Sequence, residues 1–199
     1  DKDGKNILKK INKNIVKLNS DETQKIETIN DYYDNNCILH LEYSYNDDGK
    51  NILLTNTYFL NKKMDVLNYT QVTFYNIGII EYADLKFLDG LQKVSISASI
   101  LSKDYFEEGD KKKVRYNLKI ENKGDAIALL LEMKIYHQTS PNDENREIIV
   151  PIIWSDNYFS IRGKKSYETT AEFDYNENID NKLYLDIVGW NCELNQKLN

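Results

Sequence analysis

Apolar and polar residues alternate along most of the second half of the chain. In five runs an apolar side chain occupies every second position, with mostly polar side chains between; the runs are 94–100, 114–120, 127–135, 167–173 and 183–187. Alternation of this kind is typical of a β-strand with one buried face. A sixth run, 148–154, is apolar almost throughout. We predict one further strand there.

Turn-forming segments separate these runs, namely EEGDKKK, ENKGDA, SPNDENRE, IRGKKS and YNENIDNK. They are rich in Gly, Asn, Asp and charged residues, which favour turns and loops. Six or seven short strands with such turns between them predict an immunoglobulin-like β-sandwich over residues 93–199. The apolar positions of the alternating runs are its predicted core.

Residues 1–63 carry a similar but incomplete pattern. Alternation over 39–45, the turn NDDGK and the apolar run 52–60 predict a hairpin. We predict two earlier strands at 24–29 and 7–18, although the apolar spacing of the second also fits a helix. Four strands are too few to close a sandwich. The interpretation we favour is a partial immunoglobulin-like sandwich whose opening strands lie outside this sequence, which makes the whole chain all-β.

The segment between these two units, 64–92, has neither clean alternation nor a flexible Gly/Ser-rich tract. Its aromatic residues Phe74, Tyr75 and Tyr82 predict a linker that packs on another surface. The stretch YADLKFLDGL predicts one short helical turn.

Composition and charge narrow the possible partners. The 26 Lys and Arg residues are interspersed among 32 Asp and Glu residues, for a net charge of −6, so we predict no nucleic-acid partner. No apolar stretch approaches the roughly 20 residues that cross a bilayer, so we predict no membrane partner. Cys37 and Cys192 are too few for a disulfide scaffold, and we interpret both as small buried apolar residues.

The residues that usually carry chemistry are sparse. There is no G-x-S-x-G motif, His40 and His137 are isolated, and no Cys or His spacing fits a zinc site. The 8 glycines are scattered and form no phosphate-binding loop. We therefore predict no catalytic residue, no metal site and no cofactor in this chain.

One stretch, WSDNYF at 154–159, places polar residues directly after an apolar run. It could be a binding loop, a catalytic carboxylate at Asp156 or a sharp corner of the sandwich. Cleavage of a glycosidic bond needs a second carboxylate, and no motif ties one to Asp156. We favour the corner, with Phe159 directed into the core, while Trp154 or Tyr158 could stack on a sugar ring.

Three motifs resemble the C-terminal region of glycoside hydrolase family 2 enzymes, in the branch of exo-β-D-glucosaminidases and related mannosidases. They are a strand end at 56–60, the YADL linker at 82–85, and the corner P-x-x-W-S-D-N-Y-F at 151–159 followed by Gly163. The chain departs from the pattern at Phe59, where Trp is common, and at IRGKKS, where the family often has L-x-P-G-E.

The resemblance implies a non-catalytic part of a larger enzyme. Family members place their two catalytic glutamates in a TIM barrel, which this sequence lacks, so no residue here inherits a catalytic role. The expected partner is the TIM-barrel domain of the same parent chain, and a carbohydrate substrate indirectly. In this family the last domain folds back toward the barrel, which makes Trp154, Asp156 and Tyr158 candidate substrate-proximal residues. The family also implies an extracytoplasmic location: secreted, periplasmic or lysosomal/vacuolar.

Two further interpretations stay open. Because 12% of the residues are aromatic, the chain could be a stand-alone carbohydrate-binding or adhesion module. The triplet Asn68-Tyr69-Thr70 is either an N-glycosylation acceptor in a eukaryotic secretory pathway or a chance match.

Overall fold

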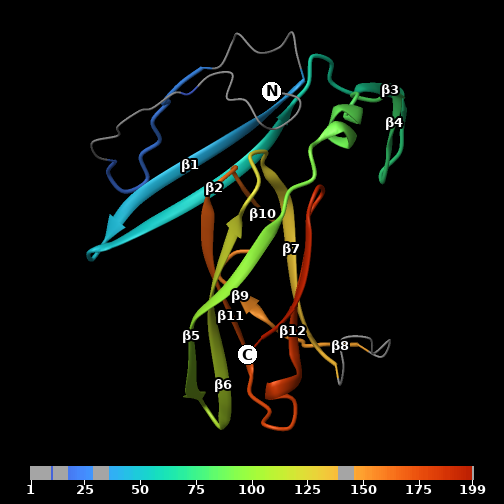
Figure 1. The fold of residues 1–199 in the computed structure, drawn as a ribbon. Coiled ribbons are helices and arrows are strands. Elements are labelled where there is room, and N and C mark those ends of the chain that lie inside the picture. Colours follow the sequence, from blue (N-terminus) through green and yellow to red (C-terminus); the bar gives the residue numbers. More distant parts are fainter. Residues whose placement is uncertain (1–9, 11–17, 29–35, 139–145, 199) are drawn as a thin grey trace. The chain divides into compact units, whose positions relative to one another are not determined.

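The computed structural model describes residues 10, 18–28, 36–138 and 146–198 (Figure 1). Their regular structure is almost entirely β, which confirms the predicted fold class. Most of the predicted strand at 7–18 lies outside the described residues, and the predicted strand at 24–29 has no regular structure over residues 24–28. None of the helices described is long and apolar enough to span a membrane.

By its contacts the chain divides into two units: Asp1–His40 with Thr57–Leu91, and Leu41–Asn56 with Gln92–Asn199. The strands β1 (Cys37–Asp47) and β2 (Lys50–Leu60) form the predicted hairpin and contribute residues to both units. Its two-residue turn has positive φ at Asp48 (45°) and Gly49 (84°), as a type I′ turn requires. The division into 1–63, 64–92 and 93–199 stays a prediction.

A second hairpin occupies the segment predicted as a linker. It consists of β3 (Val66–Val72) and β4 (Ile77–Glu81), and the predicted helical turn follows as the 3-10 helix η1 (Lys86–Gly90). The apolar side chains of this hairpin are largely exposed, and Phe74 and Tyr75 at its tip are 94% and 92% exposed.

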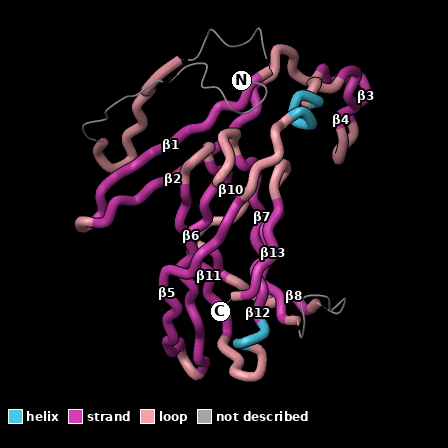
Figure 2. The backbone as a smooth tube through the Cα atoms, in the orientation of Figure 1, coloured by secondary structure: helices cyan, strands magenta, loops and turns pink. Residues whose placement is uncertain are grey.

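The second unit contains two sheets, which Figure 2 shows together with the short helix η2 (Asp180–Lys182). One has the strand order β5-β6-β11-β9, formed by β5 (Ile96–Glu108), β6 (Lys111–Asn122), β11 (Ser166–Asp174) and β9 (Ile153–Trp154). The other has the order β10-β7-β12-β13, formed by β10 (Phe159–Ile161), β7 (Ala128–His137), β12 (Leu183–Val188) and β13 (Glu193–Lys197). The short strand β8 (Glu147–Ile148) pairs with β7.

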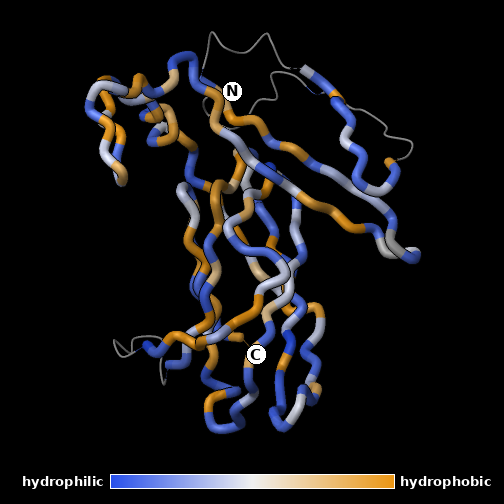
Figure 3. The backbone as a smooth tube through the Cα atoms, turned by 180° about the vertical axis from the view of Figure 1, so that it is seen from behind, coloured by the Kyte–Doolittle hydropathy of each residue, from blue (hydrophilic) through white to orange (hydrophobic). Residues whose placement is uncertain are grey.

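A single hydrophobic cluster joins the strands of the two sheets, and the alternation of hydropathy along them is visible in Figure 3. Its most buried members confirm the predicted core; they are Val114, Tyr116, Leu118 and Ile120 of β6, Leu131, Met133 and Ile135 of β7, and Leu183, Leu185 and Ile187 of β12. Cys37 and Cys192 are buried free thiols, as predicted, and burial raises the pKa of Cys192 to about 11.

The alternation in β7 changes phase at Leu130, so the prediction of one continuous face over 127–135 was wrong. Leu130 has φ of +51°, and the register with β10 shifts at this point. A bulge residue turns the following side chains to the opposite face. Ala128 and Leu131 therefore both belong to the main cluster, while Leu129 is buried outside it.

The apolar run 148–154 also differs from its prediction, because it forms two short strands in different sheets. Ile148 of β8 pairs with Tyr136 in one sheet, and Trp154 of β9 pairs with Ala171 in the other. Pro151 lies between them and has no N–H to donate to a ladder, so pairing stops there.

We expect Leu185→Ala to lower the free energy of unfolding by about 2–5 kcal/mol, because it leaves a cavity in the core. The matched control is Leu101→Ala, at a side chain that is 51% exposed, where a change within about 0.5 kcal/mol is expected. Urea denaturation followed by tryptophan fluorescence measures both. Equal midpoints for the two variants would contradict the core assignment.

Candidate functional site at the corner of the sandwich

The stretch 155–158 carries the chain from one sheet to the other. Trp154 ends β9 in the first sheet and Phe159 begins β10 in the second. Phe159 is buried in the main cluster, with its ring 4.4 Å from that of Tyr167. The corner predicted from the sequence is therefore present, and Phe159 points into the core as expected.

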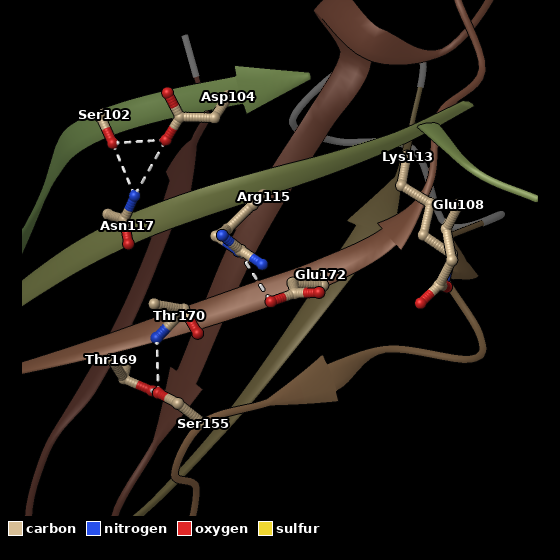
Figure 4. Close-up of polar contacts among 10 residues, drawn as sticks. All are labelled: Ser102, Asp104, Glu108, Lys113, Arg115, Asn117, Ser155, Thr169, Thr170 and Glu172. Carbon is tan, nitrogen blue, oxygen red and sulfur yellow. Dashed lines mark hydrogen bonds and ion pairs between the residues drawn. The ribbon is translucent and has the colours of Figure 1, made fainter. Parts of the chain in front are cut away.

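Ser155 fastens the beginning of the corner to β11. Its N–H donates to the carbonyl of Thr170 (3.0 Å), and its Oγ accepts from the N–H of Thr170 (2.8 Å; Figure 4). The neighbouring Thr169 donates from Oγ1 to the carbonyl oxygen of Asp156 (2.8 Å). These bonds continue the β9–β11 pairing beyond the last residue of β9.

Asn157 fastens the end of the corner to β7. Its Oδ1 accepts from the N–H of Met133 (2.8 Å) and its Nδ2 donates to the carbonyl of Met133 (3.1 Å). The side-chain amide thus satisfies the donor and the acceptor that a strand residue would satisfy. Unpaired backbone groups cost free energy when they are buried. Because the side chain of Asn157 pairs with the backbone of Met133, strand β10 can begin as late as Phe159 without leaving Met133 unpaired.

The carboxylate of Asp156 is held within the second unit. Its Oδ2 accepts a hydrogen bond from the hydroxyl of Tyr167 (2.7 Å), and that hydroxyl lies 3.5 Å from the carbonyl oxygen of Leu53 in β2. Burial, together with the bond to Asp156, raises the pKa of Tyr167 well above its ordinary value. The carboxylate of Asp156 therefore has a structural role, as the acceptor of the hydrogen bond from Tyr167.

Tyr158 is the most exposed of the three candidate residues, at 63%. Its backbone has φ of +64°, an unusual value for a residue other than glycine, and its hydroxyl donates to Oε1 of Glu132 (2.9 Å). Lys134, and secondly Tyr158, lower the pKa of Glu132, and the bond to Glu132 raises the pKa of Tyr158. Strained backbone of this kind is often found at functional sites.

The three candidates therefore have different surroundings. Trp154 packs partly against the main cluster, Asp156 bonds to Tyr167, and Tyr158 lies on the outer face of the second sheet beside Glu132. The structure makes Tyr158 the candidate most accessible to a ligand or a partner.

Sequence reasoning missed the residues around Tyr158. Val188 lies opposite Glu132 in the β7–β12 pairing, Leu130 precedes Glu132 by two positions, and the N–H of Trp190 donates to the carbonyl of Leu129 (2.8 Å). We call Leu130, Glu132, Tyr158, Val188 and Trp190 the outer patch. Leu130, Val188 and Trp190 are 37%, 51% and 49% exposed. The sequence indicated this surface only through Leu130, an apolar residue at a position where the alternation predicts a polar one.

Paired polar side chains lie on the outer face of the other sheet, whereas the outer patch contains three exposed apolar side chains. Arg115 of β6 pairs with Glu172 of β11 (2.7 Å), and Asn117 donates to Ser102 (2.6 Å) and to Asp104 (3.1 Å; Figure 4). These side chains satisfy one another on a solvated face. The contrast singles out the outer patch as the face better suited to contact another surface.

A cavity of about 670 Å³ lies elsewhere in the second unit, lined by Lys112, 148–150 and 174–179. In its lining, the ammonium of Lys112 lies 4.5 Å from the ring centroid of Tyr175, and the rings of Tyr175 and Tyr105 form a T-shaped pair with centroids 5.0 Å apart. These two contacts leave Tyr175 less available to stack on a sugar ring. In the part of the chain that the structure describes, no group of three or more His, Cys, Asp or Glu residues could hold a metal ion.

Comparison with known proteins identifies the domain. Residues 74–192 match the family described as the exo-beta-D-glucosaminidase Ig-fold domain. The chain belongs to this family. The match confirms the immunoglobulin-like fold and the resemblance to the exo-β-D-glucosaminidases.

Relatives of this Ig-fold domain are much longer proteins. It is 22% identical over 171 residues to an exo-beta-D-glucosaminidase of Arthroderma benhamiae, covering 86% of this chain and 18% of the relative. It is 24% identical over 161 residues to an exo-beta-D-glucosaminidase of Hypocrea jecorina, covering 81% and 17%. The crystal structure of the exo-chitosanase CsxA of Amycolatopsis orientalis shares the fold, with a TM-score of 0.62, 21% identity, and coverage of 80% of this chain and 18% of that one. The likeness to mannosidases stays a prediction.

We expect Asn157→Ala to lower the free energy of unfolding by about 1–3 kcal/mol, because it leaves the N–H and carbonyl of Met133 without their partner. The exposed Asn178→Ala is the matched control and is expected to change it little. Urea denaturation compares them; a loss no larger than that of the control would show that the amide does not hold the corner.

The raised pKa of Tyr167 predicts a loss of stability at alkaline pH. Between the ordinary tyrosine pKa of about 10 and the higher folded value, the native state binds more protons than the unfolded state, so the free energy of unfolding falls as pH rises. Tyr167→Phe should weaken this dependence, and Tyr69→Phe, on the exposed hairpin, should leave it unchanged. Urea denaturation at several pH values from 8 upward measures the slope, and equal slopes in all three proteins would refute the assignment.

Proposed function

We propose that this chain is a non-catalytic accessory domain of an exo-β-D-glucosaminidase-type glycosidase, and that its outer patch helps to shape the active site of a catalytic TIM barrel in the same parent protein. The family match carries the proposal, together with the size of the relatives. The chain spans only 18% and 17% of the two curated exo-beta-D-glucosaminidases, which leaves room for a catalytic domain in such proteins.

The chemistry of the outer patch supports this role. The exposed ring of Tyr158 can contact the apolar face of a sugar, and the carboxylate of Glu132 can attract the ammonium group of a glucosamine unit. The backbone of Tyr158 is fixed on both sides, by Asn157 bonded to Met133 and by Phe159 in the core. A rigid frame of this kind holds the side chain in one place for a ligand.

A second candidate function, a stand-alone carbohydrate-binding module, is favoured by the almost complete exposure of Phe74 and Tyr75 on the β3–β4 hairpin. Aromatic faces exposed to this degree can stack on sugar rings.

Hydrolysis of nitrophenyl β-glucosaminide and nitrophenyl β-mannoside, by this chain and by its full-length parent, tests the first proposal. We expect activity in the parent and none in the chain alone, since the catalytic glutamates of the family lie in the barrel. Hydrolysis by the chain alone would overturn the proposal. Binding of chitosan oligosaccharides by the chain alone, lost in the double variant Phe74→Ala and Tyr75→Ala, would favour the binding module.

Variants of the parent test the role of the outer patch. Tyr158→Ala and Glu132→Gln should each lower kcat/KM on the glucosaminide by roughly tenfold, the effect of losing about 1.4 kcal/mol of contact energy. The matched control is Thr170→Ala, whose half-buried side chain lies on the polar face of the other sheet. An unchanged kcat/KM in both patch variants would remove the outer patch from the active site while leaving the accessory assignment intact.

A further inference from the structure

The triplet Asn68-Tyr69-Thr70 is the only Asn-x-Ser/Thr sequence in the chain that could accept an N-linked glycan. The structure places it in the β3–β4 hairpin, where the pairing is irregular. Asn68 pairs with Gly78, and the next pair is Val72 with Ile77, so residues 69–71 have no opposite residue in β4. The triplet therefore begins at a paired residue and continues into a bulge.

The side chains of the triplet form a compact turn. The N–H of Thr70 donates to Oδ1 of Asn68 (3.1 Å), and so does its hydroxyl (2.6 Å). Both bonds use the oxygen of the amide and leave out its nitrogen, Nδ2. This turn therefore does not use the nitrogen that would receive a glycan, and the hydroxyl that defines the acceptor pattern is bonded to the oxygen of the same amide.

Space around the triplet is open. Tyr69 is 72% exposed, Thr70 is also exposed, and Asn68 itself is half-buried. The residue opposite Asn68 is glycine, so no side chain from β4 lies directly across from the acceptor. In addition, the hairpin has only two strands. Because no further strand of the described structure pairs with this hairpin, a modifying enzyme can approach the triplet and a glycan can extend from it.

We propose that Asn68 is the acceptor of an N-linked glycan. In the transfer, Nδ2 of Asn68 forms a bond to the anomeric carbon of a lipid-linked oligosaccharyl diphosphate. The bond from that carbon to the diphosphate oxygen breaks, the lipid diphosphate leaves with the electron pair, and one proton of Nδ2 passes to a base. The proposal applies to the chain when it enters a eukaryotic secretory pathway, and it is independent of the proposed enzymatic role.

A glycan at this position would also account for the exposed apolar hairpin. Val72, Phe74, Tyr75 and Ile80 are between 54% and 94% exposed, a degree of exposure that favours association between molecules. A bulky, hydrated glycan attached to the same hairpin would shield these side chains from other copies of the chain.

Expression of the full chain behind a cleavable secretion signal in a eukaryotic host tests the proposal. We expect a single glycan that peptide N-glycosidase removes, detected by intact mass and located at Asn68 by peptide mapping. Secreted and cell-retained protein are both analysed, so a variant that folds poorly still reports on its modification. An unmodified chain in both fractions would overturn the proposal.

The matched variants separate the triplet from its surroundings. Asn68→Gln and Thr70→Ala should abolish the glycan, Thr70→Ser should retain it, and Thr73→Ala, three residues along the same hairpin, should leave it unchanged. A modification that survives in Thr70→Ala, or that maps to another residue, would contradict the assignment of Asn68.

Discussion

The backbone between Trp154 and Phe159 must leave one sheet and enter the other while its neighbours keep their hydrogen bonds, and the side chains of Ser155 and Asn157 make this possible. Ser155 continues the pairing with β11, and Asn157 supplies the pairing that Met133 of β7 would otherwise lack. Because both bonds are made by side chains, the main chain between them can turn sharply. The rings of Phe159 and Tyr167 can then meet in the core.

The same constraint determines what the corner can offer to a ligand. Ser155 and Asn157 are occupied by the backbone of β11 and β7, and Asp156 by the hydroxyl of Tyr167. Tyr158 is the one polar-tipped side chain of the corner that lies mostly in solvent, with its backbone at positive φ. The proposed contact with a substrate therefore depends on a residue whose position is imposed by its structural neighbours, which favours a rigid wall over a mobile loop.

The outer patch shows how a local irregularity creates a surface. The bulge at Leu130 reverses the phase of β7 between Ala128 and Leu131, and Leu130 itself lies on the outside of the sheet, two positions before Glu132. In a regular strand with Leu131, Met133 and Ile135 inward, Ala128 would face outward, and the bulge instead brings Ala128 into the main cluster. The opposite sheet also has a register shift, between Ile100 and Ser102 of β5, but the residues beside it form the polar pairs of Arg115 with Glu172 and of Asn117 with Asp104.

Alternation by itself determined the all-β class, the core positions of β6, β11 and β12 and the β1–β2 hairpin, because burial of one strand face is a local property with a period of two residues. The inward direction of Phe159 followed from the interpretation of WSDNYF as a corner of the sandwich. Only the tertiary structure decided the split of 148–154 between two sheets, the bulge at Leu130 and the strand β13, whose sequence ELNQK is mostly polar. Each of these features depends on which strand pairs with the segment, and the sequence of one strand does not specify its neighbour in the sheet. The same holds for the site: the corner residues could be named from the sequence, but their partners Met133, Glu132 and Tyr167 come from strands that only the fold brings to them.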